Sequence, residues 1–295
     1  MCPRECKVNR DNGEAGYCLE SSNIRLSRAA LHMWEEPCIS GDVGSGTVFF
    51  SGCNLRCVYC QNKEIASGRI GKEISVMRLS EIFLELCEKG ALNINLVTPS
   101  HYIPQIISAL DSSKANGLNI PIVYNTSSYD KVEALKQLEG YIDIYLADFK
   151  YMDSELSLRY SNAADYPAVA KAAVSEMVRQ HPTPIFDEND ILKSGVIVRH
   201  MILPGYTKDS KAVIKFLHDT YHDDVLLSIM NQYTPLEYVC DYPEINRKLT
   251  AAEYDEVVDF AIDIGVENGY IQEGETQSES FIPSFDYEGV LKVPQ

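Results

Sequence analysis

Short apolar runs alternate with helical patterns from about residue 47 onward. The runs are rich in Ile, Val and Leu and lack strict alternation with polar residues, which is typical of strands covered on both faces. They lie at residues 47–50, 94–97, 122–124, 142–147, 196–201 and 225–229. This alternation predicts βα units and a parallel sheet.

Two helices between and after these strands have clear boundaries. Apolar residues recur at helical spacing between the first two strands, at Ile82, Phe83, Leu86 and Cys87. Ser80 is the expected cap of this helix and Gly90 its expected end. The last helix opens with a capping box at residues 250–253 and ends before Gly265.

Two end segments fall outside the pattern. Residues 1–40 carry cysteines and few apolar runs, and residues 266–295 hold six carboxylates against the single cation Lys292. We therefore expect three parts: an N-terminal Cys-bearing segment (1–40), a barrel (41–265) and an acidic C-terminal extension (266–295). The extension is either solvated or docks through Phe281, Ile282 and Phe285.

Polar residues follow each predicted strand. They stand at residues 51–53, 98–101, 125–128, 148–150, 204–205 and 231–233. Because the carboxyl ends of parallel strands share one rim, these groups are expected to converge on a single site. This arrangement is typical of an enzyme.

Charge and hydropathy exclude several classes of protein. The 295 residues contain 26 Lys+Arg and 43 Asp+Glu, a formal net charge of −17, which opposes binding to nucleic acid. No apolar run reaches the roughly 18 residues of a membrane helix, and residues 1–6 lack the apolar core of a signal peptide. We expect a soluble, cytoplasmic protein without a membrane partner.

Cysteines give the strongest chemical signal. Seven of the nine fall in the first 60 residues, and Cys53, Cys57 and Cys60 form a CxxxCxxC loop directly after an apolar strand. Three thiolates can hold three irons of a four-iron four-sulfur cluster and leave the fourth iron open. An open metal position is where a substrate or cofactor binds. The alternative is a structural zinc site, which prefers CxxC pairs and four protein ligands.

This loop resembles that of the radical S-adenosylmethionine (SAM) superfamily, and the resemblance extends over residues 30–270. More narrowly, the chain is similar to the branch related to the pyruvate formate-lyase activating enzymes. The motifs that carry this resemblance are residues 49–57, Asp148-Phe149-Lys150 and residues 198–205.

The resemblance implies a role for several residues. Cys53, Cys57 and Cys60 would bind the cluster, whose open iron would chelate SAM. Tyr59 matches the position that packs near the adenine. Asp148 and Lys150 match a motif that contacts SAM or the substrate, and the alternative for them is a surface ion pair.

Further SAM contacts are expected from the same resemblance. His200 would lie near the ribose or carboxylate of SAM, although a lone histidine on an apolar strand is more often a core residue. The family's Gly-Gly-Glu segment is replaced here by residues 98–101, so Thr98, Pro99 and Ser100 would have to substitute for it or form a plain turn. Gln61, Asn125 and Gln232 complete the expected rim.

The other cysteines divide into two groups. Cys2, Cys6, Cys18 and Cys38 could fold around a second metal, with free thiols in a packed segment as the alternative. Cys87 and Cys240 are expected to be inert.

The sequence thus predicts an α/β protein, a partial parallel (β/α)6 barrel with an N-terminal Cys-rich segment and an acidic C-terminal extension. The resemblance implies a radical SAM oxidoreductase with a 4Fe-4S cluster, SAM and an external one-electron reductant. Its substrate is either a glycyl radical enzyme, which it would activate, or a small molecule. A non-catalytic metal-binding module is the alternative from another class.

Overall fold

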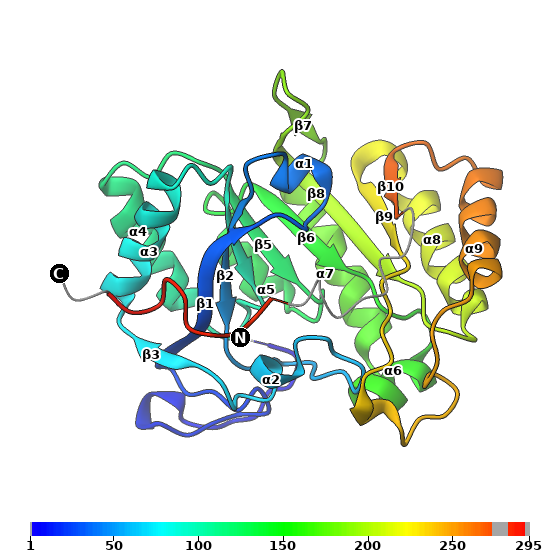
Figure 1. Ribbon diagram of the computed structural model, residues 1–295, viewed down its shortest axis with the longest axis horizontal. Helices are drawn as coiled ribbons and strands as arrows, with labels where there is room; N and C mark the ends of the chain where they lie inside the picture. The colour runs from blue at the N-terminus through cyan, green and yellow to red at the C-terminus, as the bar shows by residue number, and fades with distance from the viewer. Residues whose placement is uncertain (1, 273–282, 293–295) are drawn as a thin grey trace.

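Six parallel strands form the centre of one sheet in the computed structural model, which describes residues 2–272 and 283–292 (Figure 1). Their spatial order is β2-β4-β5-β6-β8-β9. They are β2 (Ser45–Phe50), β4 (Ile94–Val97), β5 (Ile122–Thr126), β6 (Ile144–Asp148), β8 (Leu192–Met201) and β9 (Leu226–Met230). These are the six predicted strands, and every neighbouring pair is parallel. The predicted partial parallel barrel is confirmed.

Helices cover the outer face of this sheet (Figure 1). The long ones are α3 (Val76–Glu88), α4 (Ile103–Ala115), α7 (Tyr166–Gln180), α8 (Thr207–Tyr221) and α9 (Ala251–Asp263). Shorter helices are α1 (Pro37–Ser40), α2 (Lys63–Ala66), α5 (Val132–Leu135) and α6 (Ser154–Ser161), with 3-10 turns η1 (Arg10–Asn12), η2 (Lys136–Leu138), η3 (His222–Asp224) and η4 (Glu237–Val239). No helix within the described residues is long and apolar enough to cross a membrane.

The helix boundaries agree with the sequence in one case and differ in another. The capping box of α9 is present, because the Thr250 hydroxyl and the Glu253 carboxylate each accept from the other residue's backbone N–H. By contrast, the cap of α3 lies five residues before the predicted one. Ser75 caps the helix by accepting from the Arg78 N–H, and Ser80 lies buried within it.

One long strand of the sheet was not predicted. β1 (Ile24–His32) lies beside β2 and runs antiparallel to it, although it belongs to the segment expected to lie outside the barrel. Arg25 and Arg28 interrupt its apolar run, which hides the strand in the sequence. Further short strands were also missed: β3 (Lys72–Ile74), β7 (Ile185–Phe186) and β10 (Gly269–Ile271).

The last described residues dock against β1. The N–H of Ala29 donates to Glu288, and the N–H of Tyr287 donates to Ser27 (2.8 and 3.0 Å). A Cβ on Gly289, whose φ is +70°, would come within 2.0 Å of the Ala29 carbonyl oxygen, so only glycine fits there. The Phe285 ring contacts Phe49, with centroids 5.6 Å apart. This last segment is drawn in red in Figure 1. Of the expected docking residues, Phe281 and Ile282 lie outside the described residues.

Candidate active site at the carboxyl ends of the strands

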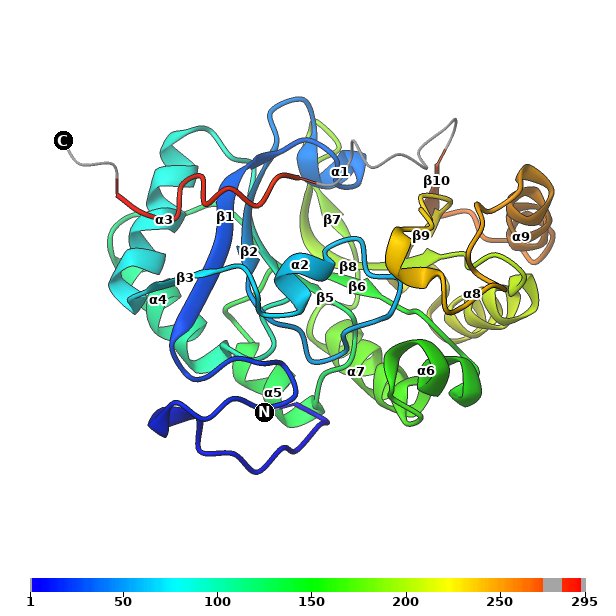
Figure 2. The same ribbon diagram turned by 60° about the horizontal axis from the view of Figure 1, so that its bottom comes forward.

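The three-cysteine loop leaves the end of the fully buried strand β2 and crosses the open ends of its neighbours to reach α2 (Figure 2). It starts at Gly52, whose φ is +82°. A Cβ at this position would lie within 2.4 Å of the Glu20 side chain and 2.5 Å of the Cys18 carbonyl oxygen. Glycine therefore lets the loop pass directly beneath the N-terminal segment.

Hydrogen-bond donors surround the sulfur atoms of the loop. Cys53 Sγ accepts from the backbone N–H groups of Leu55 and Arg56, each at 3.4 Å. Arg56 adopts a φ of +55°, which turns its N–H back toward the sulfur. Cys57 Sγ accepts from the Ser161 hydroxyl at 3.0 Å. Such donors stabilise thiolate ligands and tune the potential of an iron–sulfur cluster.

Burial disfavours ionised thiols in this loop. It raises the pKa of Cys53, and it raises the pKa of Cys60 to about 12, where neighbouring thiols add to the effect. These two thiols are therefore protonated at neutral pH until a metal replaces the proton. Lys150, whose ammonium lies near Cys57 and Cys60, is a cation that favours thiolates there.

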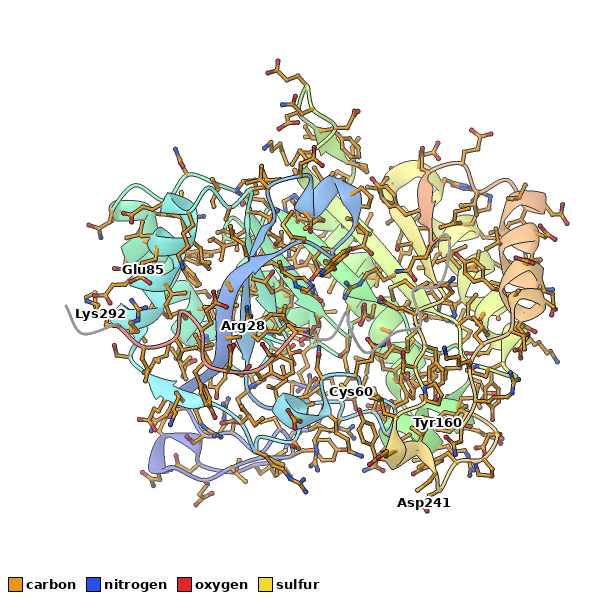
Figure 3. All side chains as sticks on the ribbon, viewed as in Figure 1. Arg28, Cys60, Glu85, Tyr160, Asp241 and Lys292 are labelled. Atoms are coloured by element: carbon orange, nitrogen blue, oxygen red, sulfur yellow. The ribbon has the colours of Figure 1, made fainter. Side chains whose placement is uncertain are left out.

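One pocket holds the three cysteines and the strand ends together. Seven of the residues predicted for the site line it: Tyr59, Gln61, Thr98, Asn125, Asp148, Lys150 and Gln232. Figure 3 labels Cys60 beside α2 at this place. The convergence of the strand ends on one site is thus observed.

Three predicted contacts do not line the pocket. Ser100 is buried beneath it, where its hydroxyl oxygen accepts from Tyr124, and Pro99 is also absent from the lining. His200 points to the other face of β8, because successive residues of a strand alternate. Its Nδ1 lies 2.7 Å from the Phe149 carbonyl oxygen, and burial lowers its pKa to about 4. The structure therefore assigns it to the core.

Arg199 takes the place in the pocket that was expected for His200. Its guanidinium donates to Asp148 at 2.8 Å, to Glu35 at 2.9 Å and to Asn125 at 2.9 Å. Lys150 also donates to Asp148, at 2.8 Å. Burial alone would raise the pKa of Asp148, but the two cations hold it below its ordinary value. The carboxylate is therefore ionised in this wall.

The sequence reasoning missed Glu35 and the neighbouring Trp34, which follow β1 and also line the pocket. Glu35 accepts from Asn95 at 3.0 Å and from Asn125 at 3.3 Å besides Arg199. The Trp34 side chain is 65% exposed at the mouth. Trp34 and Glu35 would have been placed at the site if β1 had been recognised as a strand of the sheet.

The donor set fits an iron–sulfur cluster. Within the described ranges, no three His, Cys, Asp or Glu side chains converge closely enough to hold a single metal ion. Ligands of one zinc ion must meet around 2.3 Å bonds, whereas cluster thiolates each bind a different iron and are spread wider. The loop thiols face a common pocket and accept hydrogen bonds, as cluster ligands require.

The N-terminal cysteines do not form the expected group of four. Cys38 lies in a separate core cluster with Ile39 and Val123, and burial raises its pKa to about 11. Burial also raises the pKa of Cys2 and of Cys18, and nearby thiols add to the effect. The prediction of a second metal site with these four ligands is therefore wrong, because the structure places Cys38 away from the other three.

Comparisons with known proteins agree with this site. Residues 47–217 match the model of the Radical SAM superfamily. An uncharacterized protein of Methanocaldococcus jannaschii is 30% identical over 269 residues, which cover 88% of this chain and 73% of that protein.

Two further likenesses are more distant. A pyruvate formate-lyase-activating enzyme of Staphylococcus aureus is 21% identical over 57% of this chain, and the match spans 65% of that enzyme. The crystal structure of Streptococcus suis SuiB bound to S-adenosylmethionine shares the fold, with a TM-score of 0.51 and 13% identity. That match covers 76% of this chain and about half (49%) of SuiB.

Proposed function

The chain belongs to the radical SAM superfamily, and on this premise we propose that it cleaves SAM reductively at a four-iron four-sulfur cluster bound by Cys53, Cys57 and Cys60. The bound cluster and SAM would together supply a 5'-deoxyadenosyl radical for hydrogen abstraction. The observation that carries the proposal is the convergence of the three loop thiols and the Asp148–Lys150–Arg199 wall on one pocket.

The residues of this wall support SAM binding by their charge. Lys150 faces the pocket near the loop cysteines, where its ammonium suits a carboxylate. Asp148 and Glu35 hold Arg199 and Asn125 in place by charge-assisted hydrogen bonds. Tyr59, Val97 and Phe49 supply apolar surface that excludes water.

Anaerobic reconstitution tests the proposal. The protein would be loaded with iron and sulfide, reduced with dithionite and mixed with SAM, and 5'-deoxyadenosine would be quantified. We expect product from the native protein and none from Cys57→Ala. Cys87→Ala, in which a half-buried thiol of α3 outside the pocket is removed, is the matched control. A fully loaded native protein that makes no product would contradict the proposal.

The substrate is proposed to be a glycyl radical enzyme, with the radical placed on a glycine of that partner. The likeness to the pyruvate formate-lyase-activating enzyme supports this choice. An assay would mix the loaded enzyme, SAM and a candidate partner and record the glycyl radical by electron paramagnetic resonance (EPR). The alternative is a small-molecule donor, and deuterium transfer from a labelled metabolite into 5'-deoxyadenosine would favour it.

A further inference from the structure

Tyrosine is the dominant aromatic residue of this core. The chain has 18 Tyr against 9 Phe and 1 Trp. Among the described residues, eight of the twelve largest fully buried side chains are tyrosines. Phe would fill the same volume without the cost of burying a hydroxyl group. The hydroxyl groups therefore need an explanation beyond packing.

An inner pair of tyrosines lies at the three-cysteine loop. The Tyr151 hydroxyl donates to the Tyr59 oxygen at 2.6 Å, and Tyr59 lines the pocket. Tyr151 also lies 2.8 Å from the Ser161 hydroxyl, which donates to Cys57 Sγ. Because the Tyr59 oxygen accepts in this pair, its own hydroxyl hydrogen is available to another group.

Tyr160 and Tyr206 form an outer pair, which connects the inner pair to the surface. The rings of Tyr59 and Tyr160 are in edge contact, with centroids 6.4 Å apart. The hydroxyls of Tyr160 and Tyr206 lie 2.7 Å apart, and Tyr160 donates to Glu244 Oε1 at 2.6 Å. The Glu244 side chain is 31% exposed. Figure 3 shows Tyr160 at the side of the molecule that also carries Asp241.

We propose that these tyrosines carry an oxidising equivalent from the pocket to the surface when a radical forms without its substrate. The route runs from the inner pair, Tyr59 and Tyr151, through Tyr160 to the outer partners Tyr206 and Glu244. This inference rests on the proposed SAM cleavage. It assigns the tyrosines a protective function that hydrogen abstraction from the substrate does not need.

The atoms and electrons balance along this route. A carbon-centred radical takes a hydrogen atom from the Tyr59 hydroxyl, so that a C–H bond forms, the O–H bond breaks and a phenoxyl radical remains. Tyr151 shares this radical by passing its hydrogen atom along the 2.6 Å hydrogen bond.

The inner phenoxyl then takes an electron from Tyr160 and a proton from pocket water, while Tyr160 gives its proton to Glu244. A thiol in solution returns a hydrogen atom to Tyr160, and Glu244 releases its proton to solvent.

The surroundings favour coupled loss of a proton and an electron. Burial raises the pKa of Tyr160, so its phenolate is not available for simple electron transfer. Its oxidation must therefore pass the proton to a neighbour. The hydrogen bond from Tyr160 and the nearby Arg159 hold the pKa of Glu244 below its ordinary value, so this carboxylate is ionised and can accept the proton.

The test uses the loaded enzyme with no hydrogen donor. The cluster would be reduced, the excess reductant removed, and SAM added together with a nitroso spin trap or, in a parallel sample, before freezing for EPR. We expect a phenoxyl signal that narrows when ring-deuterated tyrosine is incorporated. We also expect trapped adducts on the peptides that carry Tyr160 or Tyr206. Each sample is scored for 5'-deoxyadenosine.

Variants distinguish oxidation along this tyrosine route from nonspecific oxidation of the protein. Tyr160→Phe is expected to lose the outer adducts. Glu244→Gln, which keeps the hydroxyls and removes the proton acceptor, is expected to lose them as well while the inner signal persists. Tyr221→Phe is the matched control, because Tyr221 is a buried tyrosine of α8 whose ring contacts Phe216 and lies outside the route. It should behave as the native protein.

Two results would overturn the inference in distinguishable ways. If 5'-deoxyadenosine forms and no tyrosine-derived signal appears, the tyrosine route is wrong and the proposed function stands. The same holds if Tyr160→Phe and Glu244→Gln retain the outer adducts. If no 5'-deoxyadenosine forms, the proposed function fails and the route fails with it.

Discussion

Two regions of the chain each bring three cysteines together, and only one of them has the surroundings of a reactive site. Cys53, Cys57 and Cys60 face a common pocket beside a buried ammonium and accept hydrogen bonds from a hydroxyl and two backbone N–H groups. Cys2, Cys6 and Cys18 lie in the segment that covers this loop from outside, and Cys6 is exposed. Cysteine number alone does not distinguish the regions.

The N-terminal segment instead supports the loop. The Arg4 guanidinium donates to the carbonyl groups of Asn54 and Ser161, at 2.8 and 2.9 Å, and lies over the Tyr17 ring at 3.9 Å. Arg56 donates to the Tyr17 carbonyl at 3.1 Å. These contacts satisfy a backbone carbonyl of the loop and one of α6, and they tie the loop to the N-terminal segment. The three-cysteine loop is thus the candidate reactive site, and the N-terminal segment is the structure that covers and supports it.

Removal of one thiol from each region should show the largest difference between the two regions. We expect Cys53→Ala to lose the cluster, because two thiolates leave a second iron without a protein ligand. Cys6→Ala should keep it, since Cys6 is exposed and outside the pocket. Iron and sulfide per chain after anaerobic reconstitution measure the difference. Equal losses in the two variants would show that the N-terminal thiols also bind metal.

The charged wall should show the next largest effect. Arg199→Leu removes the guanidinium that neutralises Asp148 and Glu35, whose side chains are 19% and 9% exposed. Breaking a buried ion pair on one side costs about 3–5 kcal/mol, because it leaves a charge without its counterion. Here Glu35 loses Arg199, whereas Asp148 keeps its ion pair with Lys150. Urea unfolding of the metal-free protein measures the loss. Leu is close in volume to the aliphatic part of Arg, so a loss below about 1 kcal/mol would mean that the wall is solvated.

Acid should destabilise the fold through His101, whose imidazole lies beside the start of the loop. This buried imidazole lies 2.7 Å from the Ser51 carbonyl oxygen, and burial lowers its pKa to about 4. The unfolded chain binds the proton near pH 6.5, so stability is present above that pH and is lost as the pH falls toward 4. The difference corresponds to about 3 kcal/mol.

Comparison with His101→Gln isolates this contribution. The variant keeps a polar amide in the same place and does not titrate. Its free energy of unfolding should therefore fall less steeply than that of the native protein between pH 6.5 and 4. Parallel curves for the two proteins would assign the acid sensitivity to other groups. His200, which is buried in the barrel with a pKa of about 4, titrates in both proteins and cancels in the difference.

The same contrast explains what the sequence could predict. The six strands, the three-cysteine loop and Asp148 with Lys150 depend on local patterns, and the structure brings all of them to one pocket. Glu35 depends on the pairing of β1 with β2, which local hydropathy hides because arginines interrupt the strand. His200 and Arg199 are neighbours, so the motif alone could not say which of them faces the pocket; the alternation of β8 decides it.

The smallest predicted effect concerns the hydrogen bond from Ser161 to Cys57 Sγ. This donor stabilises negative charge on the sulfur, and the charge of a cluster rises on reduction, so the bond favours the reduced state. Loss of about 1 kcal/mol of this preference corresponds to a potential about 40 mV lower for a one-electron couple. Ser161→Ala should therefore lower the reduction potential of the cluster, measured by redox titration with EPR.

Ser157→Ala is the control for this shift, because Ser157 lies on the same helix and is fully buried, yet its hydroxyl donates to the Ser154 carbonyl instead of a sulfur. The two variants remove the same atom from the same helix and differ in the acceptor that they leave behind. If both lower the potential equally, the effect comes from looser packing of α6. If only Ser161→Ala does so, the hydrogen bond itself sets this part of the potential.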